Sequence, residues 1–236
     1  MKIKAIFFDL DGTLLPMNQD LFIKTYLGSL VEYLSRHGHN PEAVGSAIWK
    51  SIKRMMANNG EKTNEKVFWD TYVEIYGAGS REDEKTIDVF YKEEFDKVSA
   101  VTSKNPMARD AVETAKSRGF RVILATNPVF PEIATKKRIR WAGLSPEDFE
   151  YITSYENSSY SKPCVEYYRE ILEKLSLSPE ECLMIGNDTL DDMIALDVGM
   201  NVFLLADCLI NQKDCDITRY PRGGYPELIE YISSLS

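Results

Sequence analysis

Long apolar runs are missing from this 236-residue sequence. No segment approaches the roughly 18 consecutive apolar residues of a membrane-spanning helix, and the opening residues MKIKAIFFDLDG hold too short an apolar stretch for a signal peptide. Basic residues are also in the minority, since 28 Lys and Arg face 37 Asp and Glu and the formal net charge is -9. We therefore expect a soluble cytoplasmic protein that binds neither membranes nor nucleic acids.

Cysteine and histidine are also scarce. The two histidines, His37 and His39, lie together at the end of a predicted helix, and the four cysteines show no CxxC spacing. A structural zinc site needs four such ligands at characteristic spacings. We therefore expect no zinc site, and we interpret the cysteines as reduced thiols that pack as small apolar residues.

Short apolar runs are present instead, and they predict a parallel β-sheet. Five runs rich in Val, Ile, Phe and Leu are predicted strands, namely residues 3–8, 121–125, 150–153, 182–185 and 201–205. Helical patterns with start and stop signals lie between the later runs. Alternating strands and helices predict an α/β fold with a doubly wound, parallel, Rossmann-like sheet as its core.

The segment between the first two predicted strands interrupts this alternation, because it contains helical patterns and no strand. Apolar side chains recur there at spacings of three or four residues in four consecutive stretches, as with Phe22 and Tyr26. The sequence predicts an inserted, all-helical, four-helix cap domain at residues 15–99 and a Rossmann-like catalytic core of residues 1–14 and 100–236. We interpret the aromatic and Met stripes of the helices as core packing rather than as a ligand site.

Two acidic side chains directly follow the first predicted strand. In an open parallel sheet, ligands bind beyond the carboxyl ends of the strands, where strand order reverses. Asp9 and Asp11 would point to opposite sides of a continuing strand, but Gly12 allows the chain to turn so that both can face one site. One carboxylate can then act as a covalent nucleophile, and the other can donate a proton to the leaving oxygen and later accept one from water. Asp9 and Asp11 fit these two roles.

Uncharged and cationic groups follow two other predicted strands. Thr126 and Asn127 offer a hydroxyl, an amide and backbone donors that could bind phosphoryl oxygens without adding charge. Lys162, just before another helix, would place an ammonium group where a phosphorylated aspartate needs its charge offset. A lone Lys is more often solvated surface, so this residue is informative only together with the others.

A second pair of acids, Asp188 and Asp192, follows the fourth predicted strand. Several carboxylates packed together repel one another unless a cation neutralises them. Hard oxygen ligands favour Mg²⁺, so Asp9, Asp11, Asp188 and Asp192 are candidate metal ligands. The same spacing also suits an N-cap and an acid in the first turn of a helix, and the pair taken alone would favour that structural role.

Four motifs, AIFFDLDGT, VILATN, SKP and MIGNDTLDD, occur in this order along the chain. Their combination resembles the haloacid dehalogenase-like hydrolase superfamily, and the helical insert is similar to the cap between its first and second motifs. The resemblance implies a phosphatase in which Asp9 is the nucleophile and Asp11 the acid and base. It further implies that Thr126 and Asn127 contact phosphate and that Lys162 stabilises charge.

The same resemblance implies a Mg²⁺ ion that touches Asp9, the Asp11 carbonyl and Asp188. Many relatives read Gly-Asp where this chain reads Gly186-Asn187-Asp188. The first acid of that motif is therefore displaced or replaced, which leaves open whether Asp188 or Asp192 ligates the metal directly.

The favoured function is a magnesium-dependent phosphatase that hydrolyses a small phosphorylated metabolite through an aspartyl-phosphate on Asp9. A sugar-phosphate mutase similar to β-phosphoglucomutase and a noncatalytic phosphometabolite-binding protein stay open as alternatives. Within the family, an acid at Asp11 favours phosphate monoesters over dehalogenation and phosphonate hydrolysis. Asn18 or Gln19 could bind a polar substrate, and Asn18 could equally cap a helix. The physiological ester and the oligomeric state stay open.

Overall fold

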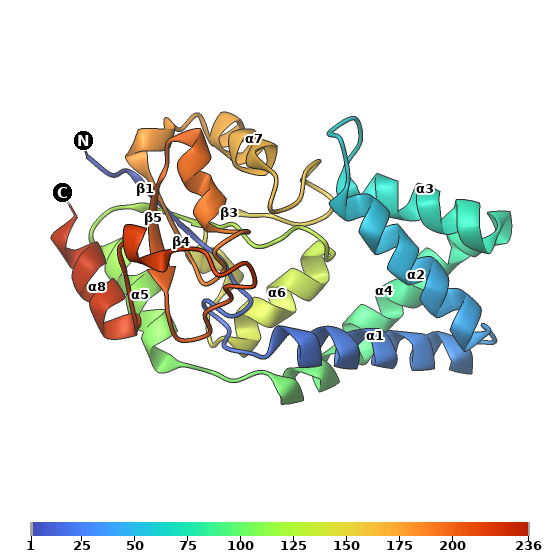
Figure 1. The fold of residues 1–236 in the computed structure, drawn as a ribbon. Helices are drawn as coiled ribbons and strands as arrows, with labels where there is room; N and C mark the ends of the chain where they lie inside the picture. The colour runs from blue at the N-terminus through green and yellow to red at the C-terminus, as the bar shows by residue number, and fades with distance from the viewer. Residues whose placement is uncertain (1, 236) are drawn as a thin grey trace.

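The computed structural model describes residues 2–235, and its centre is one sheet of six parallel strands (Figure 1). The strands are β1 (Ala5–Phe8), β2 (Arg121–Leu124), β3 (Tyr151–Ile152), β4 (Cys182–Gly186), β5 (Asn201–Leu205) and β6 (Arg222–Gly223). Their order across the sheet is β3-β2-β1-β4-β5-β6. The chain thus builds outward from β1 to β3 and then returns to the other side of β1, so strand order reverses between β1 and β4.

The predicted α/β, Rossmann-like fold is confirmed, and the predicted strands agree with the observed ones to within two residues. The first was expected at residues 3–8 and lies at Ala5–Phe8. Strand β6 was not predicted, because a two-residue strand is too short to show an alternating or continuous apolar pattern.

Eight α-helices lie within the described residues. They are α1 (Gln19–Arg36), α2 (Pro41–Met56), α3 (Asn64–Tyr76), α4 (Asp83–Glu93), α5 (Pro106–Ser117), α6 (Glu132–Trp141), α7 (Val165–Leu175) and α8 (Tyr225–Ser234). Short 3-10 helices are η1 (Ala78–Glu82), η2 (Phe95–Val101), η3 (Pro146–Asp148), η4 (Pro179–Glu181), η5 (Met193–Val198) and η6 (Ile217–Arg219). Among residues 2–235, no helix is both long and apolar enough to cross a membrane.

Side-chain caps explain where the first three helices begin. The side-chain oxygen of Asn18 accepts from the Leu21 N–H at 2.9 Å, and that of Asn40 accepts from the Ala43 N–H at 2.9 Å. Thr63 caps α3 in the same way. Each cap satisfies a backbone donor that the helix itself leaves free. Asn18 therefore caps α1, which was one of the two roles open for it.

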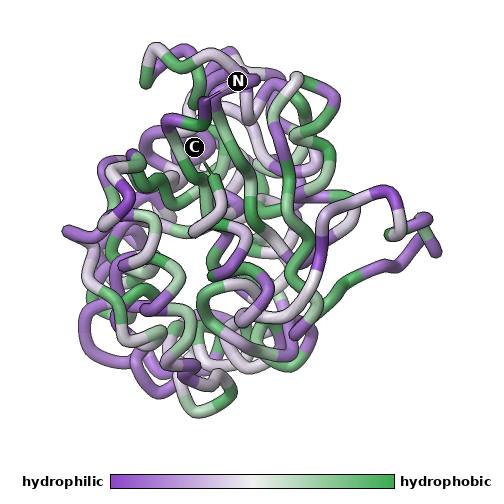
Figure 2. The backbone as a smooth tube through the Cα atoms, turned by 90° about the vertical axis from the view of Figure 1, so that its left-hand side faces the viewer, coloured by the Kyte–Doolittle hydropathy of each residue, from purple (hydrophilic) through white to green (hydrophobic). Residues whose placement is uncertain are grey.

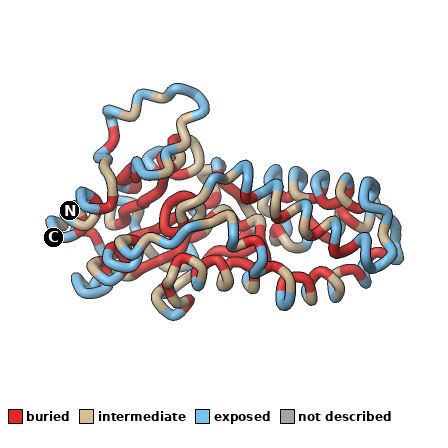
Figure 3. The backbone as a smooth tube through the Cα atoms, turned by 90° about the horizontal axis from the view of Figure 1, so that it is seen from below, coloured by how far each residue is buried: buried red, intermediate tan, exposed pale blue. Residues whose placement is uncertain are grey.

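Apolar side chains cover both faces of the sheet. Ile6 and Phe8 of β1 belong to a buried cluster with residues of α5 and α8, whereas Phe7 belongs to a second cluster with residues of α7. Successive strand residues point to opposite faces, so helices must cover both. Figure 2 shows the hydrophobic colouring concentrated along the strands, and Figure 3 shows buried residues running through the sheet and the helical segment.

Helices α1 to α4 follow one another between β1 and β2 and extend from one end of the sheet, on the side away from the two termini (Figure 1). Their buried apolar cluster also contains Phe130, Ala134 and Tyr155 from the sheet-bearing part. At the start of α3, the buried Asn64 amide donates to the Pro128 carbonyl at 3.1 Å. The helical segment is thus joined to the core by packing and hydrogen bonds, and its division into a cap at residues 15–99 stays a prediction.

Candidate active site

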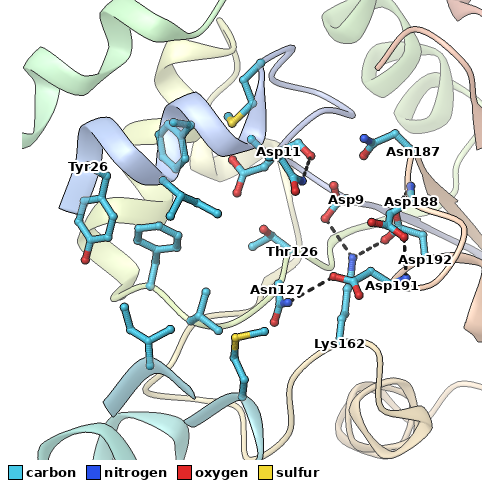
Figure 4. A pocket seen from close by; sticks show the side chains of 18 of the residues that line it. Asp9, Asp11, Tyr26, Thr126, Asn127, Lys162, Asn187, Asp188, Asp191 and Asp192 are labelled. Carbon is cyan, nitrogen blue, oxygen red and sulfur yellow. Dashed lines mark hydrogen bonds and ion pairs between the residues drawn. The ribbon is translucent and has the colours of Figure 1, made fainter. Parts of the chain in front are cut away.

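A cavity of about 270 Å³ lies at the carboxyl ends of β1, β2 and β4 and is also lined by α1 and α2 (Figure 4). Every site residue predicted from the sequence lines it, namely Asp9, Asp11, Thr126, Asn127, Lys162, Asp188 and Asp192. The cavity lies where strand order reverses, as expected for an open parallel sheet. The structure therefore brings these residues together, and their chemical roles stay predictions.

Lys162 lies between two carboxylates at the base of the cavity (Figure 4). Its ammonium group donates to Asp9 Oδ1 at 3.0 Å and to Asp192 Oδ1 at 2.6 Å. Lys162 and Asp192 are each only 1% exposed, so this Lys is not solvated surface. Burial alone would lower the pKa of Lys162, but the Asp192 and Asp9 carboxylates outweigh it and raise that pKa well above its usual value. The ammonium group therefore stays charged.

The second oxygen of Asp192 is occupied as well. Asp192 Oδ2 accepts from the Asp188 N–H at 3.0 Å, which fixes the loop after β4. Asp188 Oδ1 in turn accepts from the backbone N–H groups of Leu190 and Asp191 at 2.7 and 3.1 Å. The helix-capping role that the spacing also suited is not observed, because Asp192 precedes η5 without a side-chain cap and Asp188 stabilises the turn before it. Asp188 also lies in the cavity wall.

Arg138 is a site residue that the sequence did not reveal. This α6 side chain is fully buried, donates to Asp11 Oδ2, and donates to Thr135 Oγ1 at 3.2 Å. Its guanidinium carbon lies 4.2 Å from the centroid of the Phe130 ring. In the sequence it lies within the basic run KKRIR, where nothing distinguishes a buried Arg from exposed ones.

The Asp11 carboxyl group has one held oxygen and one free oxygen. Arg138 holds Oδ2, whereas Oδ1 is buried and has no hydrogen-bond partner among the described residues. Burial raises the pKa of Asp11, and the nearby Arg138 guanidinium opposes that rise. A buried oxygen without a partner is costly in a folded protein, so this atom is a candidate contact for a ligand.

The contacts of the Asn187 side chain give a structural reason for the Asn in the Gly186-Asn187-Asp188 motif. Thr13 Oγ1 lies 2.9 Å from Asn187 Oδ1 and 3.1 Å from Asp9 Oδ2, and Asn187 Nδ2 donates to the Cys208 carbonyl at 2.7 Å. Gly12 has φ +86°, and a Cβ there would lie 2.4 Å from Asn187 Nδ2. Asn187 thus links the turn after β1 to the loop after β5, and Gly12 is required by both backbone angle and space.

Thr126 and Asn127 follow β2 and line the cavity. The Thr126 carbonyl accepts from Tyr167 Oη at 2.9 Å and from Thr153 Oγ1 at 2.7 Å, which fixes this strand end. Asn127 Nδ2 reaches Asp191 Oδ2 at 3.4 Å, while Asn127 Oδ1 is buried without a partner among the described residues. Asp191 also lines the cavity, and burial raises its pKa to about 6.

The donor set suits Mg²⁺. Asp9, Asp188 and the Asp11 carbonyl present only oxygen atoms, and the Asp11 carbonyl accepts a single long hydrogen bond, from Gln19 Nε2 at 3.3 Å. Within residues 2–235, no group of three or more His, Cys, Asp or Glu side chains is arranged to hold a metal by itself. Mg²⁺ commonly keeps several waters and is held by one or two carboxylates, so a three-residue cluster is not required.

Gly186 offers a test of the geometry around Lys162. A Cβ at this position would lie 2.1 Å from Asp192 Cγ, and Asp192 is too enclosed to move freely. We expect Gly186→Ala to lower the free energy of unfolding by about 1–3 kcal/mol. Gly28→Ala is the matched control, because nothing lies within 4 Å of the added Cβ in α1, and it is expected to stabilise the protein by about 0.5–1 kcal/mol.

Urea denaturation of both variants measures these changes. Equal midpoints for Gly186→Ala and the unmodified protein would show that Asp192 is not held as described.

The fold and the cavity together define an α/β protein with an acidic site where the strand order reverses. The family model for haloacid dehalogenase-like hydrolases matches residues 3–197, and the chain belongs to this family of hydrolases.

Curated proteins and solved structures are similar to this chain over most of its length. A phosphoglycolate phosphatase of Aquifex aeolicus is 25% identical over 189 residues, which are 80% of this chain and 78% of that protein. The pyrophosphatase PpaX of Halalkalibacterium halodurans is 22% identical over 240 residues, which cover 98% of both chains. The crystal structure of a HAD phosphatase from Thermococcus onnurineus matches with a TM-score of 0.59 at 17% identity and covers 99% of each chain.

Proposed function

We propose that this protein is a magnesium-dependent phosphatase that hydrolyses a small phosphate monoester through an aspartyl-phosphate on Asp9. The observation that carries the proposal is the Asp9 carboxylate in the cavity wall, 3.0 Å from the buried Lys162 ammonium, with the Asp11 carboxyl group in the same wall. Relatives named as a phosphoglycolate phosphatase and a pyrophosphatase support phosphoryl transfer to water.

In the first step, an Asp9 carboxylate oxygen attacks phosphorus, and the bond from phosphorus to the ester oxygen breaks. Asp11 donates a proton to the departing oxygen, which leaves as the alcohol. In the second step, Asp11 accepts a proton from water as that water attacks the aspartyl-phosphate. Inorganic phosphate departs and the Asp9 carboxylate is restored.

Arg138 and Lys162 orient the two carboxyl groups of this scheme. Arg138 holds Asp11 Oδ2, so the buried Oδ1 is the atom left to exchange the proton. Lys162 stays cationic and offsets the charge that builds up as Asp9 becomes phosphorylated. Thr126 and Asn127 contribute neutral donors to the phosphoryl oxygens, which adds no charge to an acidic site.

Asp9, the Asp11 carbonyl and Asp188 would hold Mg²⁺, which supplies charge neutralisation for the phosphoryl group. We assign the direct contact to Asp188 rather than to Asp192. Only Oδ1 of Asp188 is hydrogen-bonded among residues 2–235, whereas both oxygens of Asp192 are hydrogen-bonded and its side chain is only 1% exposed. Asp192 then acts as a positioning residue for Lys162. The helical cap at residues 15–99 is proposed to cover the site and limit access of water.

A phosphate-release assay with phenyl phosphate tests the proposal. Free phosphate is expected in the presence of Mg²⁺, and addition of excess EDTA is expected to lower the rate by about 100-fold or more, because the metal supplies several kcal/mol of stabilisation. Restoration by added Mg²⁺ is the control. An unchanged rate in EDTA would contradict the metal requirement, and an isomerised sugar phosphate without free phosphate would identify a mutase instead.

A further inference from the structure

The cavity has two chemically different halves (Figure 4). On one side lie the carboxylates, Lys162 and Asn127. On the other side, α1, α2 and the segment after β2 contribute apolar side chains that include Phe22, Tyr26 and Phe130. The bulk of a bound ester, beyond its phosphoryl group, would therefore meet the apolar half.

Several apolar side chains of this half are unusually exposed. Ile23 is 41% exposed, Trp49 is 43% exposed and Met56 is 47% exposed, and all three line the cavity. Exposed apolar side chains that line a cavity beside polar groups are typical of a ligand-binding site. A ligand that covers these side chains would remove their apolar surface from water.

No Lys or Arg among the described residues lines the apolar half of the cavity. The Arg138 guanidinium lies against Phe130 but is not a lining group and is held by Asp11. Lys162 is the one Lys or Arg among the described residues that line the cavity, and two carboxylates already neutralise it. The cations of α2, Lys50, Lys53 and Arg54, are exposed and do not line the cavity. Lys53 lies over the Trp49 ring, with Nζ 5.2 Å from the ring centroid.

An anionic leaving group would be poorly accommodated here. Moving a carboxylate or a second phosphate against apolar walls removes water without supplying a paired charge, which is costly. Asp188 and Asp191 in the opposite wall would add repulsion. Phosphoglycolate and pyrophosphate, the compounds in the names of two relatives, both carry such a group.

Resting on the phosphatase function proposed above, we infer that the preferred substrate is a phosphate monoester of an uncharged alcohol with a single aromatic ring or an aliphatic group of similar size. A cavity of about 150 Å³ is large enough to bind benzene. The observed cavity of about 270 Å³ therefore has room for one such group together with the phosphoryl group.

A matched pair of esters tests this inference. Benzyl phosphate and 4-carboxybenzyl phosphate differ by one carboxylate, and kcat/KM is expected to be about tenfold or more higher for benzyl phosphate. The same preference is expected over phosphoglycolate and pyrophosphate. Equal or higher kcat/KM for the anionic compounds would overturn the inference.

Substitutions in the apolar half of the cavity test which side chains cause the preference for benzyl phosphate. Trp49→Ala and Met56→Ala are expected to lower the ratio of kcat/KM for benzyl phosphate over methyl phosphate by about tenfold, because only benzyl phosphate reaches these side chains. Leu21→Ala is the matched control, since Leu21 is 48% exposed but does not line the cavity, and it should leave the ratio unchanged. An unchanged ratio in both wall variants would overturn the assignment of this surface.

Lys53→Met provides a separate control for charge. The discrimination between benzyl phosphate and 4-carboxybenzyl phosphate is expected to stay the same in this variant. A change in that discrimination would show that Lys53 interacts with the charge of the leaving group, which contradicts the inference.

Failure of the inference is distinguishable from failure of the phosphatase function. If the protein prefers phosphoglycolate or pyrophosphate to benzyl phosphate and Asp9→Asn is inactive, the proposed phosphatase function is supported and the inferred preference for apolar esters is contradicted. If no ester releases phosphate in the presence of Mg²⁺, both the phosphatase function and the inferred substrate preference are contradicted.

Discussion

Asp9→Asn is expected to lower phosphate release from phenyl phosphate by a factor on the order of 10⁴ or more, as commonly follows the loss of a covalent nucleophile. The neutral amide does not attack phosphorus as a carboxylate does. The fold should be retained, because Lys162 keeps its contact with Asp192 and can donate to the amide oxygen, while the amide nitrogen can donate to Thr13 Oγ1. Steady-state rates and a thermal unfolding curve of the same preparation measure both expectations.

Asp191→Asn is the matched control for this experiment. It makes the same chemical change in the same cavity wall, at a carboxylate that has no part in the proposed steps. Its rate is expected to stay within about tenfold of the unmodified protein, since a residue outside the reacting set contributes indirectly. Equal losses in the two variants would show that the cavity needs its overall charge rather than a nucleophile at Asp9.

Lys162→Met is expected to lower the free energy of unfolding by about 3–5 kcal/mol, because it leaves buried carboxylates without their counter-charge. The destabilising effect is expected to be largest at Asp192, because Asp192 is 1% exposed and its Oδ1 lies 2.6 Å from the Lys162 ammonium. The change is also expected to reduce turnover, as nothing then offsets the charge on a phosphorylated Asp9. Urea denaturation and phosphate release measure the two effects.

The double variant Lys162→Met with Asp192→Asn separates a buried ion pair from simple packing. Removing both partners leaves no unpaired charge at Asp192, so its loss of stability is expected to be smaller than the sum of the two single losses. Additive losses would show that Lys162 and Asp192 are not coupled. Turnover should stay low in the double variant, because the ammonium group is still missing.

Much of the fold could be predicted from local sequence patterns. The buried parallel strands are continuous apolar runs, and the helices carry apolar spacing with caps such as Asn40 and Thr63. Strand β6 was missed because it has only two residues. The predicted parallel arrangement indicated the location of the site, since polar residues that follow parallel strands meet at one edge of the sheet.

Contacts between distant residues could not be predicted in the same way. Arg138 meets Asp11 across 127 positions in the chain, and no local pattern marks an Arg as buried. The interpretation of the helical aromatic stripe as core packing was incomplete. Phe22 and Tyr26 belong to the buried cluster of the helices, yet both also line the cavity, because they lie where that cluster meets the site.

The central claim, that Asp9 becomes phosphorylated, is tested most directly by trapping the intermediate. Protein mixed with phenyl phosphate and Mg²⁺ is quenched in acid within the first turnover, reduced with borohydride, digested and examined by mass spectrometry. Borohydride converts an acyl phosphate to an alcohol, so the peptide containing Asp9 is expected to carry homoserine at that position, in amounts that depend on substrate. An unmodified Asp9 peptide in a sample that has released phosphate within that turnover would contradict the account.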